Sequence, residues 1–189
     1  MQCPKCDSHR LFPTRLELDL AAYQCKRCQG HLVALIAYRD WMERHQLPEV
    51  EESVALQLAD TTTALQCTRC NRLMTKYGYD LAGHKLDYCS HCDDVWLDAG
   101  EWAYLRAIKL AGELPAVLTA PWQRKLKQQR YEKNSAEQWK KKIGSNSYDR
   151  VAAFGQWLWS QQSAKSIIDY LSIPRDSDTN SDSDSNSTP

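Results

Sequence analysis

The sequence of 189 residues lacks the apolar segments that mark a membrane-spanning or secreted protein. It has no run of 18 apolar residues to cross a bilayer, and no short apolar core of a signal peptide near its start. The third residue, Cys3, already belongs to the cysteine pattern described below, so removing a leader would break that pattern. We therefore expect a protein of the reducing cytoplasm with no membrane partner.

The sequence also lacks an excess of charge of either sign, with 24 Lys and Arg against 24 Asp and Glu. Balanced bulk charge gives no argument for nucleic-acid binding, so only a local basic surface can support it. Four thiolates around one Zn²⁺ carry a net charge of about −2, so two such sites would make the metal-loaded protein mildly acidic. No convergent set of catalytic groups stands out, and we predict neither an enzyme nor a small-molecule substrate.

What the sequence does contain is four Cys-x-x-Cys pairs, which use all eight cysteines. The pairs form two sets, each with eighteen residues between its pairs, and the second set repeats the first 64 positions later. Two such pairs joined by a hairpin bring four sulfurs to one point, which is the arrangement of structural zinc. We predict one Zn²⁺ per set, two in all. The predicted ligands are Cys3, Cys6, Cys25, Cys28, Cys67, Cys70, Cys89 and Cys92.

Other uses of the cysteines are weaker alternatives. Four disulfides would need a secreted protein, and a catalytic zinc would keep one position open for water. Iron in a rubredoxin-like site has the same four-sulfur geometry as zinc and differs from it in colour. Labile zinc in a redox-sensitive or metal-handling protein is the alternative from a different functional class.

Residues 1–46, the first module, read as a metal-binding hairpin followed by a helix. Alternation through Leu16, Leu18 and Leu20 predicts a strand, and Pro13 is expected at a sheet edge or turn. The residue after the second cysteine of each pair is expected to have positive φ, which Asx side chains tolerate. Three of the four pairs have Asx there: Asp7, Asn71 and Asp93.

Residues 67–114, the second module, repeat this order. We expect strands near 73–79 and 84–88, and a helix over about 99–112. Asp98 is predicted to be the N-cap of this helix and Glu101 to complete a capping box, which explains both carboxylates without catalysis. Trp96 is expected to pack beside the metal hairpin.

A module of this size rarely buries enough apolar surface to fold alone, so the metal is expected to be part of the fold. The predicted class is a small metal-stabilised α+β protein. It has two tandem zinc ribbons with rubredoxin-like β-hairpin knuckles, each followed by a short helix, and then a C-terminal helical hairpin and a disordered tail. The predicted parts are 1–46, a linker over 47–66 that includes a helical stretch, 67–114, a helical extension over 119–172, and an acidic Ser/Asp-rich tail over 173–189.

The second module resembles the transcription factor IIB-type zinc-ribbon family. The matching residues are Cys67, Cys70, Cys89, Cys92, Trp96, Leu97, Asp98, Gly100 and Glu101. Asp93 and Asp94 replace glycines common in that family. The first module matches in its cysteines and Gly30, but it has Ala34 and Ala37 in place of the Asp and Glu. The resemblance implies a zinc site in both modules and a non-enzymatic interaction module, with a transcription-related role as one form of it.

The helical extension is basic and aromatic. Residues 119–144 and 147–172 have the apolar spacing of two helices, and nine Lys/Arg stand against three Asp/Glu from 122 to 150. This stretch is either a solvated helix face or a surface for phosphates and bases. We expect a protein partner first and nucleic acid second. The candidate binding residues are Trp122, Arg124, Lys125, Lys127, Arg130, Lys133, Trp139, Lys140, Lys141 and Lys142.

Overall fold

The computed structural model describes residues 1–7, 9–47, 58 and 62–173. It divides into two compact units, Met1–Glu132 (unit 1) and Lys133–Pro189 (unit 2). The helix predicted within the linker lies outside the described residues except for Leu58, and the predicted tail does so except for its first residue, Ile173.

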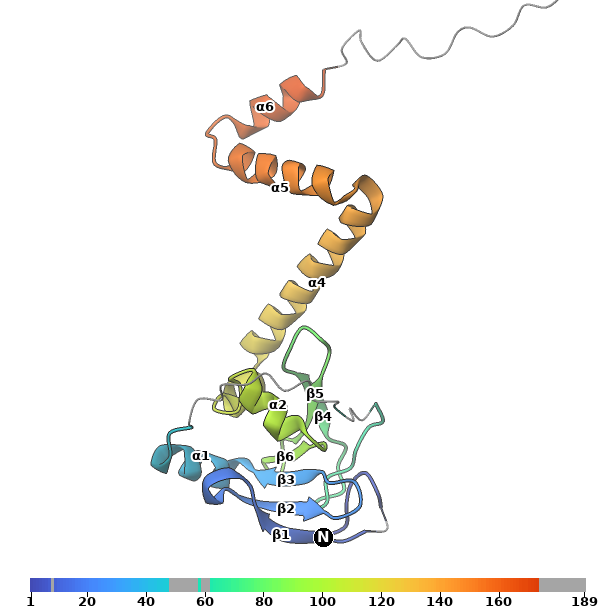
Figure 1. Ribbon diagram of the computed structural model, residues 1–189, viewed down its shortest axis with the longest axis vertical. Coiled ribbons are helices and arrows are strands. Elements are labelled where there is room, and N and C mark those ends of the chain that lie inside the picture. The colour runs from blue at the N-terminus through green and yellow to red at the C-terminus, as the bar shows by residue number, and fades with distance from the viewer. Residues whose placement is uncertain (8, 48–57, 59–61, 174–189) are drawn as a thin grey trace, which may run out of the picture. The chain divides into compact units, whose positions relative to one another are not determined.

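Both modules contribute strands to one antiparallel sheet in unit 1 (Figure 1). The strands are β1 (Leu11–Arg15), β2 (Ala21–Cys25), β3 (His31–Ala34), β4 (Thr75–Gly78), β5 (Lys85–Cys89) and β6 (Asp94–Leu97). Among the described residues the sheet has six strands in the order β1-β2-β3-β6-β5-β4. Pro13 lies in β1, an edge strand, as its missing N–H requires.

The two modules meet at the centre of this sheet, where β3 pairs with β6. Leu32 lies opposite Trp96, the residue 64 positions later, and both are buried. His31 lies opposite Leu97 and Val33 opposite Val95. Leu32 and Trp96 are thus separated by the same 64 positions that separate the two cysteine sets. The strand register therefore relates the two modules by an approximate two-fold axis through this pair.

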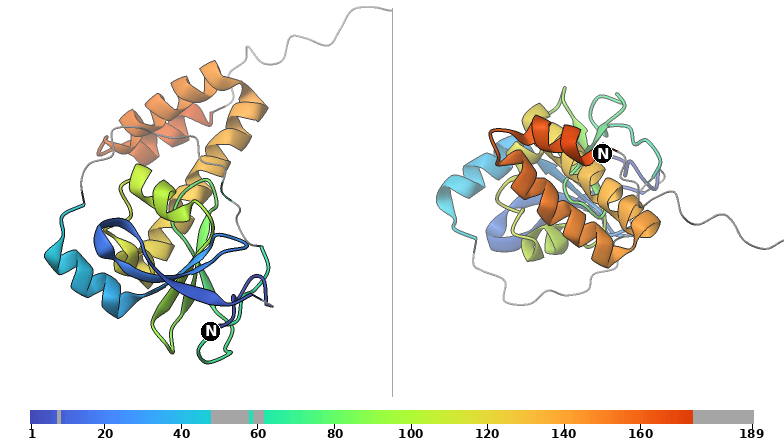
Figure 2. Two further views of the ribbon diagram at one scale, coloured as in Figure 1. Left: turned by 60° about the horizontal axis from the view of Figure 1, so that its bottom comes forward. Right: turned by 90° about the horizontal axis from the view of Figure 1, so that it is seen from above.

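Short helices complete unit 1. Their bounds are η1, a 3₁₀ turn (Glu17–Asp19), α1 (Leu35–Arg44), α2 (Glu101–Ala107), α3 (Leu114–Val117) and the first part of α4 (Ala120–Ile143). Figure 2 shows α1 continuing from the end of β3. Side chains of α1, α2 and α3, including Trp41, Leu105 and Leu114, share one buried cluster with Leu97 of the sheet. Both modules therefore form one apolar core.

The strand predicted through Leu16, Leu18 and Leu20 is wrong. Leu18 and Asp19 adopt left-handed φ values of 49° and 69°, and the chain turns between β1 and β2 instead of running straight. The turn is supported from outside, because the Trp41 indole Nε1–H donates to the Leu18 carbonyl at 2.8 Å. Leu20 is fully buried, so the apolar alternation reflects a packed turn.

The helix predicted over 99–112 is also shorter than expected, since α2 ends at Ala107. Lys109 takes a left-handed φ of 59°, and the N–H groups of Leu110 and Ala111 then reach back to the Leu105 carbonyl. This is the hydrogen-bonding pattern of a helix C-terminus. Pro115 stands in the first turn of α3, a position that suits its missing N–H.

The C-terminal extension holds three helices, and the predicted two-helix hairpin is corrected. Ile143 ends α4, Ser145–Trp159 forms α5, and Ala164–Leu171 forms α6. The helix predicted over 147–172 breaks after Trp159, where the Ser160 hydroxyl donates to the Trp157 carbonyl at 2.6 Å. Serine side chains that compete for backbone groups in this way favour helix ends.

Candidate metal centres

The eight cysteines gather into two groups of four. Within each group the four Sγ atoms lie within 4.8 Å of one another. The Cys3 and Cys28 sulfurs are 3.6 Å apart, as are those of Cys70 and Cys89. Tetrahedral zinc with Zn–S bonds of about 2.3 Å requires sulfurs about 3.8 Å apart, so both groups fit a four-coordinate ion. Neither group includes a histidine.

The same backbone turn presents the sulfurs in all four pairs. The N–H of Asp7 donates to the Cys3 carbonyl at 3.0 Å. The equivalent bonds, from the residue after each second cysteine to the carbonyl of the first, measure 2.8–2.9 Å in the other pairs. These residues have the positive φ values expected: Asp7 55°, Gln29 59°, Asn71 55° and Asp93 58°. The turn aims backbone N–H groups at sulfur, as with Cys6 N–H to Cys3 Sγ at 3.3 Å.

These hydrogen bonds shift the thiol pKa values of the metal-free groups. Burial raises the pKa of Cys3. Burial also opposes ionisation of Cys25, but backbone N–H bonds from Cys28 and Arg27 outweigh it and lower the pKa of Cys25 to about 7. A backbone N–H bond from Arg72 lowers the pKa of Cys70 to about 7. Each group thus has one thiol that ionises near neutral pH, and a thiolate is the form that binds metal.

The two cysteine groups border the same cluster of buried apolar side chains. The first cysteine of each pair is buried and the second is half-buried. Leu32, Leu65, Met74 and Trp96 complete a single buried cluster with cysteines of both groups. Trp96 packs beside the metal groups, as predicted. The first cysteine of each pair is therefore shielded from water, and the second is partly accessible.

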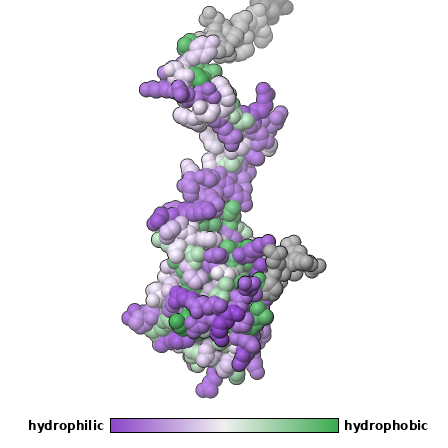
Figure 3. Space-filling model, turned by 90° about the vertical axis from the view of Figure 1, so that its left-hand side faces the viewer, coloured by the Kyte–Doolittle hydropathy of each residue, from purple (hydrophilic) through white to green (hydrophobic). Residues whose placement is uncertain are grey.

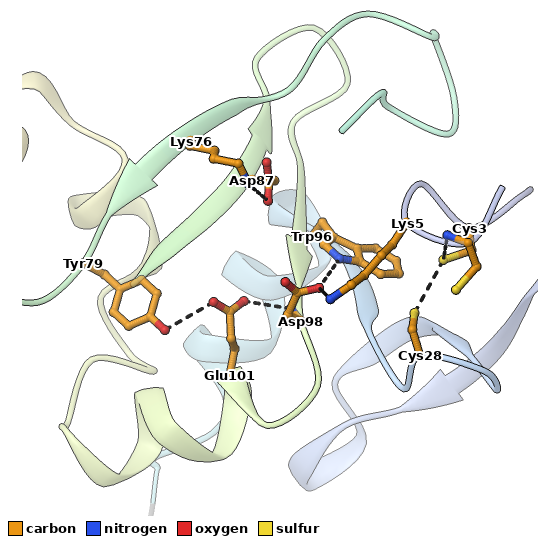
Figure 4. Close-up of polar contacts among 10 residues, drawn as sticks. Cys3, Lys5, Cys28, Lys76, Tyr79, Asp87, Trp96, Asp98 and Glu101 are labelled. Atoms are coloured by element: carbon orange, nitrogen blue, oxygen red, sulfur yellow. Dashed lines mark hydrogen bonds and ion pairs between the residues drawn. The ribbon is translucent and has the colours of Figure 1, made fainter. Parts of the chain in front are cut away.

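A polar network behind Trp96 ties the first pair of cysteines to the second module (Figure 4). Asp98, which is 3% exposed, accepts from the Trp96 indole at 3.1 Å and pairs with the Lys5 ammonium at 3.0 Å. Glu101, 1% exposed, accepts from the Asp98 backbone N–H at 2.7 Å and from the Tyr79 hydroxyl at 3.2 Å.

Only the Glu101 half of the predicted capping box is present. The residue at the N-cap of α2 is Gly100, with φ 83°, and no side chain caps the helix. The Asp98 carboxylate is directed to Lys5 and Trp96, so the expectation that it caps α2 is corrected. No local pattern shows this, because Lys5 lies 93 residues away in sequence.

Two more ion pairs join the modules: Arg39 to Asp93 at 2.9 Å, and Arg106 to Glu17 at 2.7 Å.

Asp94 is fully buried, and burial raises the pKa of its carboxyl group, an effect that the charge of Arg69 opposes. Arg69 Nε lies 2.9 Å from an Asp94 oxygen but is not aligned as a hydrogen bond. We read the contact as an ion pair that partly offsets the cost of burying this carboxyl group.

Two of the ten candidate binding residues of α4 are engaged within unit 1. Trp122 packs against the core of unit 1, and Arg130 donates to the Asp80 carbonyl at 2.7 Å. The other eight candidates are exposed along α4. Near its end, the Lys142 ammonium lies over the Trp139 ring, 4.9 Å from the centroid.

A second polar cluster, absent from the sequence prediction, closes the β4–β5 turn. Asp80 accepts the N–H groups of Gly83 and His84, contacts the His84 ring at 2.6 Å, and accepts from the Tyr104 hydroxyl at 2.9 Å. Burial opposes ionisation of Asp80, but these bonds hold the pKa of its carboxyl below its usual value. The sequence signal for this cluster was an Asp three residues before a Gly, a spacing typical of a turn in which the Asp side chain binds backbone N–H groups.

The fold and site define a small α+β protein with two four-cysteine groups that can each hold a metal ion. No family model matches the chain, and no curated protein or solved structure shows significant similarity to it. Within the described residues, none of the helices combines the length and hydropathy needed to cross a membrane.

Proposed function

We propose that the protein is a tandem zinc-ribbon protein of the transcription factor IIB type, with one structural Zn²⁺ held by each four-cysteine group. The carrying observation is that four cysteine pairs, far apart in sequence, share one turn geometry and bring their sulfurs to two points. When bound, the ions would cross-link the knuckles and stabilise the sheet. Cys3, Cys6, Cys25 and Cys28 would hold one ion, and Cys67, Cys70, Cys89 and Cys92 the other.

The donor sets favour a structural role over a catalytic one. Four thiolates saturate tetrahedral zinc and leave no position for water or a substrate. The buried carboxylates near the second group in sequence all have partners. Asp98 and Glu101 are engaged by Lys5, Trp96 and Tyr79. Asp87 pairs with Lys76, and Asp94 pairs with Arg69. We therefore infer a non-enzymatic protein that binds a macromolecule in the reducing cytoplasm.

A protein partner is the first expectation and nucleic acid the second. The basic residues of α4 support the nucleic-acid branch, because Arg124, Lys125 and Lys127 are exposed on unit 1. The test is a gel shift with nonspecific DNA and RNA from about 50 to 200 mM salt. Binding that weakens steeply with salt, and that weakens further on replacing these three residues with alanine, supports phosphate contacts. No shift at low salt removes this branch and leaves a protein partner.

The redox alternative has one observation in its favour, since the second cysteine of every pair is half-buried within reach of small oxidants. Oxidation of a pair to a disulfide would release its zinc. Zinc content and free-thiol count, before and after mild peroxide, decide between the two functions. A structural role requires both ions to stay bound while low-pKa thiols of a reference protein oxidise.

A further inference from the structure

A basic groove lies over the first module, on β1, β2 and β3 beside α1. Its volume is about 740 Å³. Arg15, Arg44, His45 and Arg69 line it, against one acidic residue, Asp19. Asp19 pairs with Arg15 at 3.1 Å. In the view from the α1 side, the surface of unit 1 is mainly hydrophilic with small apolar patches (Figure 3).

The positions of the second module that correspond, by the 64-residue repeat, to the groove residues Ala34 and Ala37 carry acidic side chains. Asp98 stands 64 positions after Ala34, and Glu101 stands 64 positions after Ala37. Both carboxylates are buried, and Asp98 pairs with Lys5 of the first module (Figure 4). The second module thus fills this place with its own acidic side chains.

The groove of the first module has an equivalent cation beside it, Arg69 of the second module, but no acidic side chains at positions 34 and 37; the Nε of Arg69 pairs with the buried Asp94. Arg69 stands 64 positions after Lys5 and reaches from the second module into the groove beside Ala34. Its position follows from the sheet register, because its partner Asp94 lies directly opposite Ala34. The Arg69 side chain is 43% exposed, so the guanidinium remains accessible from the groove. Ala34 and Ala37 leave open the volume that the Asp and Glu side chains occupy in the second module.

We propose that this groove binds an acidic peptide segment of a partner protein, with a carboxylate placed beside Arg69 as Asp98 is placed beside Lys5. The proposal rests on the proposed function, an interaction protein, and names the partner's chemistry. Arginine pairs well with carboxylate because two of its N–H groups can reach both oxygens.

The lining favours a peptide over a nucleic-acid backbone. Besides its cations, the groove presents the accessible side chains of Pro13 and Tyr23, above a floor formed by the buried Leu32 and Trp41. Its volume falls in the range of about 300–1,000 Å³ typical of binding pockets. An apolar floor with a few convergent charges suits one acidic side chain in an otherwise mixed sequence.

The test uses the full zinc-loaded chain on an array of short randomised peptides. We expect Asp or Glu to be enriched at one position among the bound peptides. The key variant is Ala34→Asp, which supplies the missing carboxylate from within. Ala34 is the N-cap of α1, where Asp is well tolerated. The new carboxylate would lie opposite Asp94, a like-charge pairing that costs stability, but Arg69 lies beside both, so the variant should fold and keep two zinc ions, checked by its metal content. Its affinity for the best acidic peptides should fall by about tenfold or more.

Ala34→Asn is the matched control, because it has the size of Asp without the charge, and it should lose much less affinity. Arg44→Glu, at the end of α1, tests the same groove independently and should weaken acidic peptides selectively. The inference is overturned by an array without acidic preference, or by equal losses in Ala34→Asp and Ala34→Asn. It is also overturned if Ala34→Asp weakens a single-stranded oligonucleotide of about 16 nucleotides but no peptide. If the chain lacks sulfur-bound zinc, the proposed function itself fails, which is a distinct result.

Discussion

At the scale of single residues, Gly30 shows how closely the modules are fitted together. A Cβ atom added there would lie 2.3 Å from Cζ2 of Trp96, which is far inside van der Waals contact. Gly30→Ala should therefore destabilise the zinc-loaded protein by about 1–3 kcal/mol, as overpacking does. Denaturant unfolding measures this.

Gly112→Ala is the matched control within unit 1, because its Cβ would meet its nearest neighbours at an ordinary 3.5 Å. It should change stability by less than about 0.5 kcal/mol. Equal effects of the two substitutions would contradict the close packing of Trp96 on Gly30.

Lys5 carries the second residue-scale prediction. Replacing it with methionine keeps the apolar stem and removes the ammonium from the nearly buried Asp98. Because Lys5 itself is 27% exposed, we expect a loss of about 2 kcal/mol, below the range for a fully buried pair. A double-mutant cycle with Asp98→Asn should show coupling of at least about 1 kcal/mol. Additive single effects would show that the pair contributes nothing specific.

The residue scale also shows what a sequence can and cannot reveal. The left-handed turns after the cysteine pairs followed from Asp7, Asn71 and Asp93, because the preference is local. The role of Asp98 did not, since its partner Lys5 is distant in sequence. The predicted capping box assigned Asp98 to the nearest helix start. Its Glu101 contact is confirmed, and its Asp98 contact is wrong.

At the scale of elements, the β3–β6 pairing couples the two modules. The divergence of the first module, which lacks the Asp and Glu, suggests that it is held mainly by its metal. The shared sheet and the common Leu32–Trp96 cluster argue that it cannot lose its metal alone. Cys6→Ser should therefore increase amide exchange in β6 as well as in β1–β3. Protection of β6 that is unchanged in this variant would mean that the modules fold independently.

The same pairing explains which elements were predictable. Cysteine spacing and alternation indicated the hairpins, because both act within one module. The central β3–β6 contact joins two short apolar strands from different modules. Nothing in either strand's sequence indicates that it pairs with the other. The turn at Leu18 and the break after Trp159 were missed because apolar periodicity continues through both.

The first part of α4 belongs to unit 1. Gln123 exchanges hydrogen bonds with the Gly78 backbone at 2.8 and 3.2 Å, and Leu126 is buried. A chain ending after Glu132 should keep near-native stability of the sheet, whereas one ending after Leu118 should lose about 2–4 kcal/mol by losing Trp122 and Leu126. Thermal unfolding of the two zinc-loaded chains measures this. Equal midpoints would show that α4 contributes nothing to unit 1.

At the scale of the whole molecule, metal and apolar packing act together. Unit 1 has an apolar core of its own around Trp41 and Leu97, and the metal groups adjoin a second cluster around Trp96. We predict that each small module depends on its metal for stability. The burial of each module against the other is a second source of stability.

The most direct test of the central claim is the metal content and ligand set of the native protein, by mass spectrometry under native conditions and X-ray absorption at the zinc edge. We predict two zinc ions per chain, each surrounded by four sulfurs at about 2.3 Å. A single ion, iron in place of zinc, nitrogen or oxygen ligands, or cysteines paired as disulfides would contradict the account.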